Sequence, residues 1–94
     1  MNKVEVLFLD RAIKRAGVLL FSKKDTLDFI EQCEYYKIVI LGIDGFFISK
    51  YKTLPSMEDS IDYSSSLLSD DIYKKAIEFV NERNDSLHFE IICG

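Results

Sequence analysis

The stretch KIVILGIDGFFISKYK (37–52) decides the fold, because it is the strongest strand signal in the chain. It is rich in β-branched and aromatic residues, and its first half is apolar on both faces, as in a central strand. Gly42 and Gly45 lie on either side of Asp44, which predicts a bulge within one strand or a tight turn between two. We expect Gly42, Asp44 and Gly45 to be structural, with Asp44 accepting hydrogen bonds from neighbouring amides.

Two helices and a short strand are predicted before this stretch. The first helix ends at Gly17, and its apolar stripe consists of Val6, Leu9, Ile13 and Ala16. VLLF (18–21) is too short for a helix and is expected to be a buried strand. Ser22 is the predicted N-cap of a second helix that runs to about Tyr36. Its core-facing half consists of Leu27, Phe29, Ile30, Cys33 and Tyr36.

The rest of the chain predicts a loop, a helix and a closing strand. Residues 53–69 show no periodicity and contain Pro55, so we expect an ordered loop. Ser69 is a good N-cap for a third helix that ends near Asn84, and LHFEIIC (87–93) is typical of a strand. The order α-β-α-β(β)-α-β predicts one α/β domain over residues 1–94. We expect an α+β sandwich, with a mixed sheet of three to four strands covered by about three helices.

Composition excludes several classes of protein. No apolar run approaches the roughly 18–20 residues that cross a bilayer, and the N-terminus lacks the apolar segment of a signal peptide, so we expect a cytoplasmic protein. Cys33 and Cys93 are expected to be free thiols, and no metal or cofactor is expected, because no ligand spacing is present. No catalytic motif is found either. We therefore predict that the chain is not an enzyme; Asp44 with His88 is the minor catalytic alternative.

The charge of the chain is unevenly distributed. Residues 1–24 carry six Lys or Arg against two acids, whereas residues 25–94 carry six against fourteen. Five carboxylates and no Lys or Arg lie in LPSMEDSIDYSSSLLSDD (54–71). Such a balance repels nucleic acid and attracts a basic protein surface. We expect a protein partner, with neither nucleic acid nor a membrane involved.

The chain resembles a family of small bacterial immunity proteins over roughly residues 20–94. The similar segments are VILGIDGFFIS, LPSMEDSIDYS, IYKKAIEFVNE and LHFEIIC, in this order. Members of this family are cytosolic antidotes in polymorphic-toxin and contact-dependent growth inhibition systems. The resemblance implies that the chain binds the C-terminal domain of its cognate toxin, often a basic nuclease, as a monomer, and neutralises it. Gly45 departs from the bulkier residue expected after the aspartate, and no catalytic residue is implied.

Two acidic patches are candidates for binding the toxin. The first lies in and around residues 54–71 and consists of Tyr51, Glu58, Asp59, Asp62, Tyr63, Asp70 and Asp71. Asp70 and Asp71 are also expected to stabilise the start of the third helix. The second patch lies on the exposed side of the second helix and consists of Asp28, Glu31 and Tyr35. The alternative function is a small regulatory module that binds a ligand or dimerises through a strand edge, for which GFFISKY (45–51) is the candidate.

Overall fold

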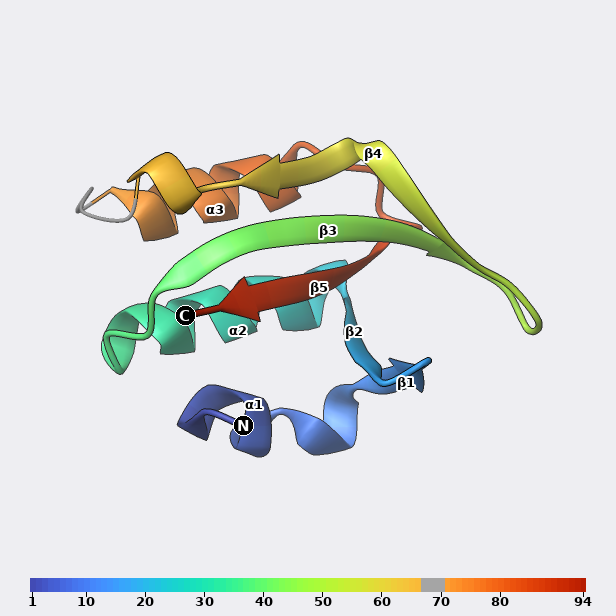
Figure 1. Ribbon diagram of the computed structural model, residues 1–94, viewed down its shortest axis with the longest axis horizontal. Helices are drawn as coiled ribbons and strands as arrows, with labels where there is room; N and C mark the ends of the chain where they lie inside the picture. The colour runs from blue at the N-terminus through green and yellow to red at the C-terminus, as the bar shows by residue number, and fades with distance from the viewer. Residues whose placement is uncertain (67–70) are drawn as a thin grey trace.

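A five-stranded antiparallel sheet forms the centre of the computed structural model, which describes residues 1–66 and 71–94 (Figure 1). The order of strands across the sheet is β1-β2-β5-β3-β4, with every paired neighbour antiparallel. The predicted α+β class is confirmed, although the sheet is larger than expected and is not mixed. The strands are Ile13–Arg15 (β1), Val18–Ser22 (β2), Ile40–Ile48 (β3), Thr53–Asp62 (β4) and His88–Cys93 (β5).

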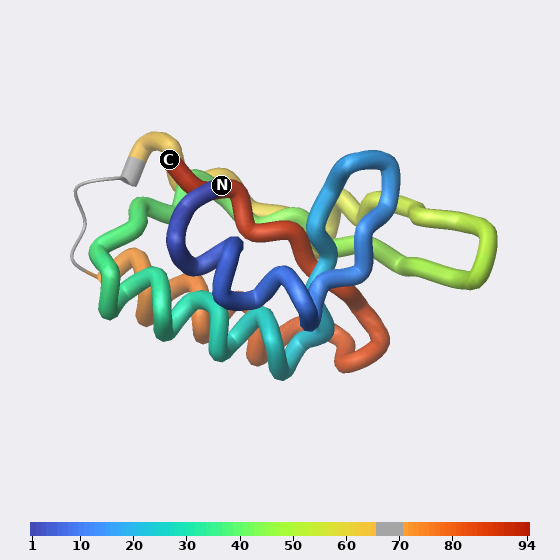
Figure 2. Tube along the Cα trace, turned by 90° about the horizontal axis from the view of Figure 1, so that it is seen from below, coloured from blue at the N-terminus to red at the C-terminus, as the bar shows by residue number. Residues whose placement is uncertain are grey.

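Two helices, Lys23–Tyr35 (α2) and Ile72–Asn81 (α3), lie side by side and cover one face of the sheet (Figure 2). A single helical turn, Lys3–Leu7 (α1), and the 3-10 turn Leu9–Arg11 (η1) close the core beside α2. A second 3-10 turn, Ser64–Ser66 (η2), follows β4. Within the residues that the structure describes, no helix has the length and apolar character needed to cross a membrane.

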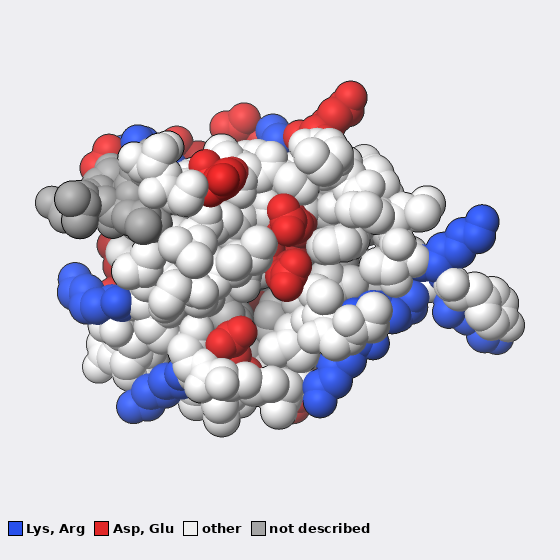
Figure 3. Space-filling view, in the orientation of Figure 1, with Lys and Arg blue, Asp and Glu red and all other residues white. Residues whose placement is uncertain are grey.

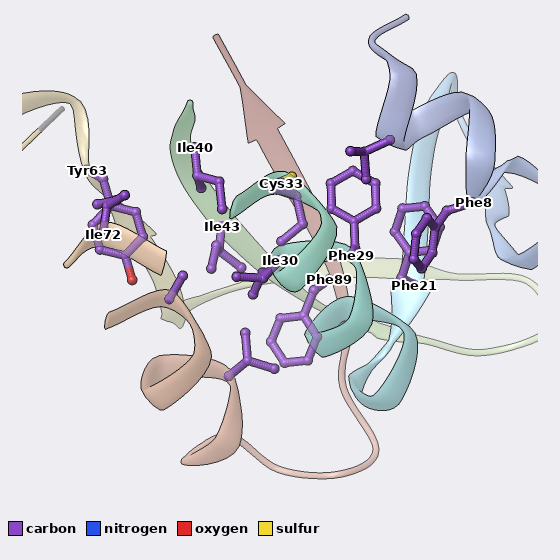
Figure 4. Packing of buried hydrophobic residues seen from close by; sticks show 14 of the residues in the cluster. Phe8, Phe21, Phe29, Ile30, Cys33, Ile40, Ile43, Tyr63, Ile72 and Phe89 are labelled. Atoms are coloured by element: carbon purple, nitrogen blue, oxygen red, sulfur yellow. The ribbon is translucent and has the colours of Figure 1, made fainter. Parts of the chain in front are cut away.

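The hydrophobic core lies between the sheet and the two long helices. Ile30 from α2 lies between Ile43 and Phe89 of the sheet, and all three are completely buried (Figure 4). Three aromatic rings close the core at the β2 end, with ring centroids 5.2 to 6.2 Å apart. Edge-to-face and tilted contacts of this kind stabilise a core beyond the area that they bury. The three rings are Phe8, Phe21 and Phe29.

The first predicted helix is wrong beyond its first turn. Asn2 and Glu5 form a reciprocal capping box that starts α1, but the helix ends at Leu7. Val4 and Phe8 are the buried residues, whereas Val6, on the predicted stripe, is 58% exposed. The apolar stripe at helical spacing therefore did not identify which side of the short helix α1 is buried.

Gly17 lies in the turn of a β-hairpin and does not end a helix. Ala16 and Gly17 both have positive φ, 51° and 80°, between strands β1 and β2. Two consecutive residues with positive φ are typical of a type I′ turn. The twist of this turn matches the right-handed twist of the two strands that it joins. This backbone costs alanine some conformational free energy, whereas glycine adopts it without that cost.

Residues 53–62 form strand β4, so the loop predicted there is wrong. β4 pairs with β3 from Thr53 to Ser56 and again from Ser60 to Asp62, but residues 57–59 have no partner in the register. This large bulge removes any simple alternation of polar and apolar residues, which hid the strand in the sequence. β3 is one continuous strand, so the bulge alternative at Asp44 and Gly45 is confirmed and the tight turn is not.

The remaining predictions for helices and strands are confirmed. The Ser22 hydroxyl accepts a hydrogen bond from the Asp25 amide at the start of α2, as an N-cap should. β2 and β5 occupy the two segments predicted as strands. α3 begins at Ile72 and ends at Asn81, three residues earlier than expected. The predicted cap at Ser69 lies outside the described residues.

Candidate partner-binding site

One face of the sheet is covered by no helix of the described residues. Phe89, Ile91 and Ile43 point into the core, so their neighbours Glu90, Ile92 and Asp44 point to the opposite side. We call this side the open face; it carries Leu41, Asp44, Ser60, Asp62, Glu90 and Ile92. Seen from this side, Asp and Glu atoms gather over the middle of the sheet and Lys and Arg lie at its margins (Figure 3).

A groove of about 400 Å³ runs along the open face between β4 and β5. Its apolar walls include Leu41 and Ile92, and Met57 from the bulge is 85% exposed beside it. The remaining lining residues are Gly42, Asp44, Ser60, Ile61 and Asp62. Apolar walls with a few charged groups are typical of a binding surface rather than of a solvated sheet.

Glycine is required where β3 and β4 approach each other. A Cβ at Gly45 would lie 2.6 Å from the Asp59 carbonyl oxygen, and one at Gly42 would lie 2.9 Å from that of Ile61. This close approach gives both glycines a role in the packing of the two strands. Asp44 differs from its prediction, since its carboxylate makes no hydrogen bond or ion pair with any described residue.

Asp44 instead faces a second carboxylate on the next strand. Asp44 and Glu90 are registered partners of β3 and β5, so their side chains are neighbours on the open face. Burial, and then the charge of Asp44, raise the pKa of Glu90 above its ordinary value of 4.5. Like charges in this position destabilise a sheet, and no Lys or Arg in the described part of the chain pairs with either carboxylate.

Replacing Glu90 by glutamine is therefore expected to stabilise the free protein by roughly 0.5 kcal/mol at neutral pH, a small effect because the side chain is partly solvated. A raised folded pKa means that protonation of Glu90 favours folding; this stabilisation is complete below the unfolded pKa and is lost as the pH rises through the folded pKa. The gain from Glu90→Gln should therefore vanish near pH 4 and be complete near pH 7. Urea unfolding at both pH values measures it.

A matched variant, Glu78→Gln, removes the same charge from the exposed side of α3. Its stability should follow that of the unchanged protein at both pH values. Equal gains from the two variants would show that net charge, and not the Asp44–Glu90 contact, is responsible.

An arginine from the opposite layer holds the bulge in β4. The Arg83 Nε atom lies 3.7 Å from the Asp59 carboxylate, and its Nη1 atom donates to the Glu58 carbonyl oxygen at 3.4 Å. Asp59 also accepts a 2.7 Å hydrogen bond from the Ser56 hydroxyl. Asp59 is thus occupied within the protein, whereas the Glu58 residue is exposed.

Two further candidates of the first patch separate at the end of β4. Asp62 lines the groove, and the Ser64 amide, which donates to its carboxylate at 2.8 Å, lowers the pKa of Asp62. Tyr63 is only 5% exposed and packs in the core, so its prediction as a surface anchor is wrong. Successive side chains of an extended segment point to opposite sides, so Tyr63 points inward because its neighbour Asp62 points outward. Burial raises the pKa of Tyr63.

Tyr51 was predicted to lie on an acidic surface, but its surroundings are basic. It is 85% exposed at the tip of the β3–β4 hairpin, and the Lys50 amine lies 5.4 Å from its ring centroid. Arg15 donates to the Ser49 and Lys52 carbonyl oxygens and so ties this tip to the β1–β2 hairpin. The hairpin extends beyond the helices, away from the acidic middle of the open face (Figure 1).

The second acidic patch lies in the helix layer and does not merge with the first. Asp28 pairs with Arg11 at 3.6 Å and with Lys24 at 4.0 Å, so its charge is largely offset. Glu31 is exposed, and Tyr35 is 74% exposed with its ring against Tyr36. This patch therefore presents less negative charge than its sequence indicated.

The other candidates of the first patch lie at the start of α3. Asp71 is exposed and precedes the helix without a side-chain capping bond. Asp70 lies outside the described residues. Sequence reasoning missed Glu90 as a surface residue and assigned Asp44 to structure, with catalysis as the minor alternative. Alternation in LHFEIIC was the signal that pointed Glu90 away from the core.

The strand-edge alternative is only partly contradicted. Gly45 and Phe46 of GFFISKY have β5 on one side and β4 on the other, so they are not at an edge, whereas Phe47 and Ile48 pair with β4 alone. The exposed edge on this side is β4, where Pro55 and the bulge disfavour pairing with a second sheet. Asp44 and His88 are not registered partners either, because His88 lies opposite Phe46.

No family model matches the chain, and no curated protein matches it significantly.

Proposed function

We propose that this chain is a cytoplasmic immunity protein that binds a basic toxin domain one to one through the open face and thereby neutralises it. The observation that carries the proposal is the uncovered sheet face, where an apolar groove is lined by Asp44 and Asp62, two carboxylates that form no ion pair with any described residue. It agrees with the family that the sequence resembles. Catalysis is not part of the proposal.

The chemistry of the face supports a protein partner. Carboxylates at its middle would attract a basic surface over a distance and would disfavour partners of the same sign. Exposed Met57 and the walls of the groove supply apolar area, which adds affinity once the two proteins meet. Lys and Arg lie mainly at the margins, so they do not neutralise the middle of the face (Figure 3).

Co-expression with the cognate toxin tests the proposal. The toxin expected is the C-terminal domain of a large secreted protein encoded next to this chain. The unchanged chain should restore growth of cells that express the toxin, and titration calorimetry should give a one-to-one complex. Continued killing with no complex would contradict the proposal.

Charge reversal separates the two acidic patches. Glu58→Lys, in the exposed bulge of β4, combined with Asp62→Lys, in the groove, should weaken the complex by about 100-fold, because two attractive contacts become repulsive. Asp28→Lys with Glu31→Lys reverses the same number of charges on α2 and should change the affinity by less than about threefold. Circular dichroism checks that both variants fold. A larger loss from the α2 pair would move the interface to the helix layer.

A further inference from the structure

Two carboxylates, Asp44 and Glu90, face each other at the middle of the open face, and the proposed partner must supply a group that interacts with them. Asp44 and Glu90 are neighbours across β3 and β5, and within residues 1–66 and 71–94 neither is paired with a Lys or Arg. Both are half-buried, and like charges on directly opposed residues of neighbouring strands repel each other. The free protein therefore holds an unfavourable arrangement that a cation from outside would relieve.

The groove next to this pair has the shape and chemistry for an extended side chain. It measures about 400 Å³, near the lower limit of about 300 Å³ for small-ligand pockets, so it suits side chains rather than a folded element. Leu41 and Ile92 provide apolar walls, and Gly42 contributes no side chain that would fill it. Lysine and arginine have an apolar stem that packs on such walls while the charged group meets the acids.

We propose that Asp44 and Glu90 together receive one lysine or arginine side chain of the partner, whose stem packs along the groove between Leu41 and Ile92. This inference rests on the proposed function, since it names the group of the toxin that the open face recognises. The planar guanidinium of arginine, with five donors, suits two carboxylates on neighbouring strands better than the single ammonium of lysine. No third ligand joins the pair in the described part of the chain, which disfavours a metal ion as the occupant.

Calorimetry with a catalytically inactive toxin domain tests the pair. Asp44→Asn and Glu90→Gln should each weaken binding by about 30-fold, and the double variant by about 100-fold, less than the product, because both carboxylates bind the same cation. The matched control combines Asp10→Asn with Glu78→Gln, two exposed acids away from the open face, and should bind within about threefold of the unchanged chain.

Substitution in the toxin identifies the cation. One of its Lys or Arg residues, changed to glutamine, should give a similar loss, and that loss should nearly disappear when it is combined with Asp44→Asn and Glu90→Gln. An Arg→Lys change at that position should retain part of the affinity if arginine is the occupant.

The outcomes separate the two proposals. If the unchanged chain neutralises the toxin but the double variant binds within threefold of it, the inference is overturned and the proposed function stands. If the unchanged chain neither binds nor neutralises the toxin, the proposed function fails and the inference fails with it. Losses that multiply fully in the double variant would show two separate contacts, and so would also overturn the shared receptor.

Discussion

Phe89→Ala is expected to lower the free energy of unfolding by about 4 kcal/mol. Phe89 lies on the central strand β5, is completely buried, and has Phe21 and Gly45 as its registered partners. Because Gly45 has no side chain, little can move into the space that the ring leaves, and a cavity should persist. Domains of this size have roughly 5–15 kcal/mol of total stability, so the loss would remove much of it.

Phe47→Ala provides the matched control for this prediction. Phe47 lies on β3 beyond the helices and is 46% exposed, so the same substitution should cost less than about 1.5 kcal/mol. Urea unfolding followed by circular dichroism measures both variants. Similar losses at the two positions would contradict the location of the core between β5 and the helices.

Gly45→Ala is expected to cost about 3 kcal/mol, at the upper end of the range for overpacked sites. The new Cβ would lie 2.6 Å from the Asp59 carbonyl oxygen and 2.9 Å from the Asp59 Cβ atom. A backbone atom cannot rotate away, so β4 must shift and the hydrogen bond from the Gly45 amide to the Ser60 hydroxyl should weaken. The bulge and the groove beside it should loosen together.

Gly94→Ala is the control for added volume alone. A Cβ there would meet only the Leu41 side chain, at 3.4 Å, which is ordinary contact for a flexible group. Its stability should lie within about 0.5 kcal/mol of the unchanged protein. Thermal unfolding compares the two variants; an unchanged melting temperature for Gly45→Ala would mean that the strands do not approach so closely.

The long amphipathic elements could be predicted because their periodicity spans several turns. Ser22 and the apolar residues of α2 satisfy the same local rules in the sequence and in the fold, and α3 follows the same pattern. The first segment did not follow them. α1 is one turn long, and whether Val4 or Val6 is covered depends on Phe21 and Phe29, which come later in the chain.

The residues of the candidate site could be predicted only in part from the sequence. Asp62 was identified by its charge and lines the groove, and Glu58 is exposed in the bulge of β4, whereas Tyr63 was counted as a surface residue although it is buried. Glu90 is separated from Asp44 by 46 positions, and only the pairing of β5 with β3 brings the two carboxylates together. Charge can be counted in a sequence, but the distance between charges cannot.

The sequence by itself determined the α+β class, the places of the two long helices, the interior strand at residues 40–48 and the excess of acid after residue 24, because these depend on local composition and periodicity. Only the tertiary structure decided which face of the sheet stays uncovered, which carboxylates lack a cation and which are held by Arg83 or Arg11. The reason is physical: burial and electrostatic pairing depend on distances between residues far apart in the chain, and those distances exist only after the sheet has formed.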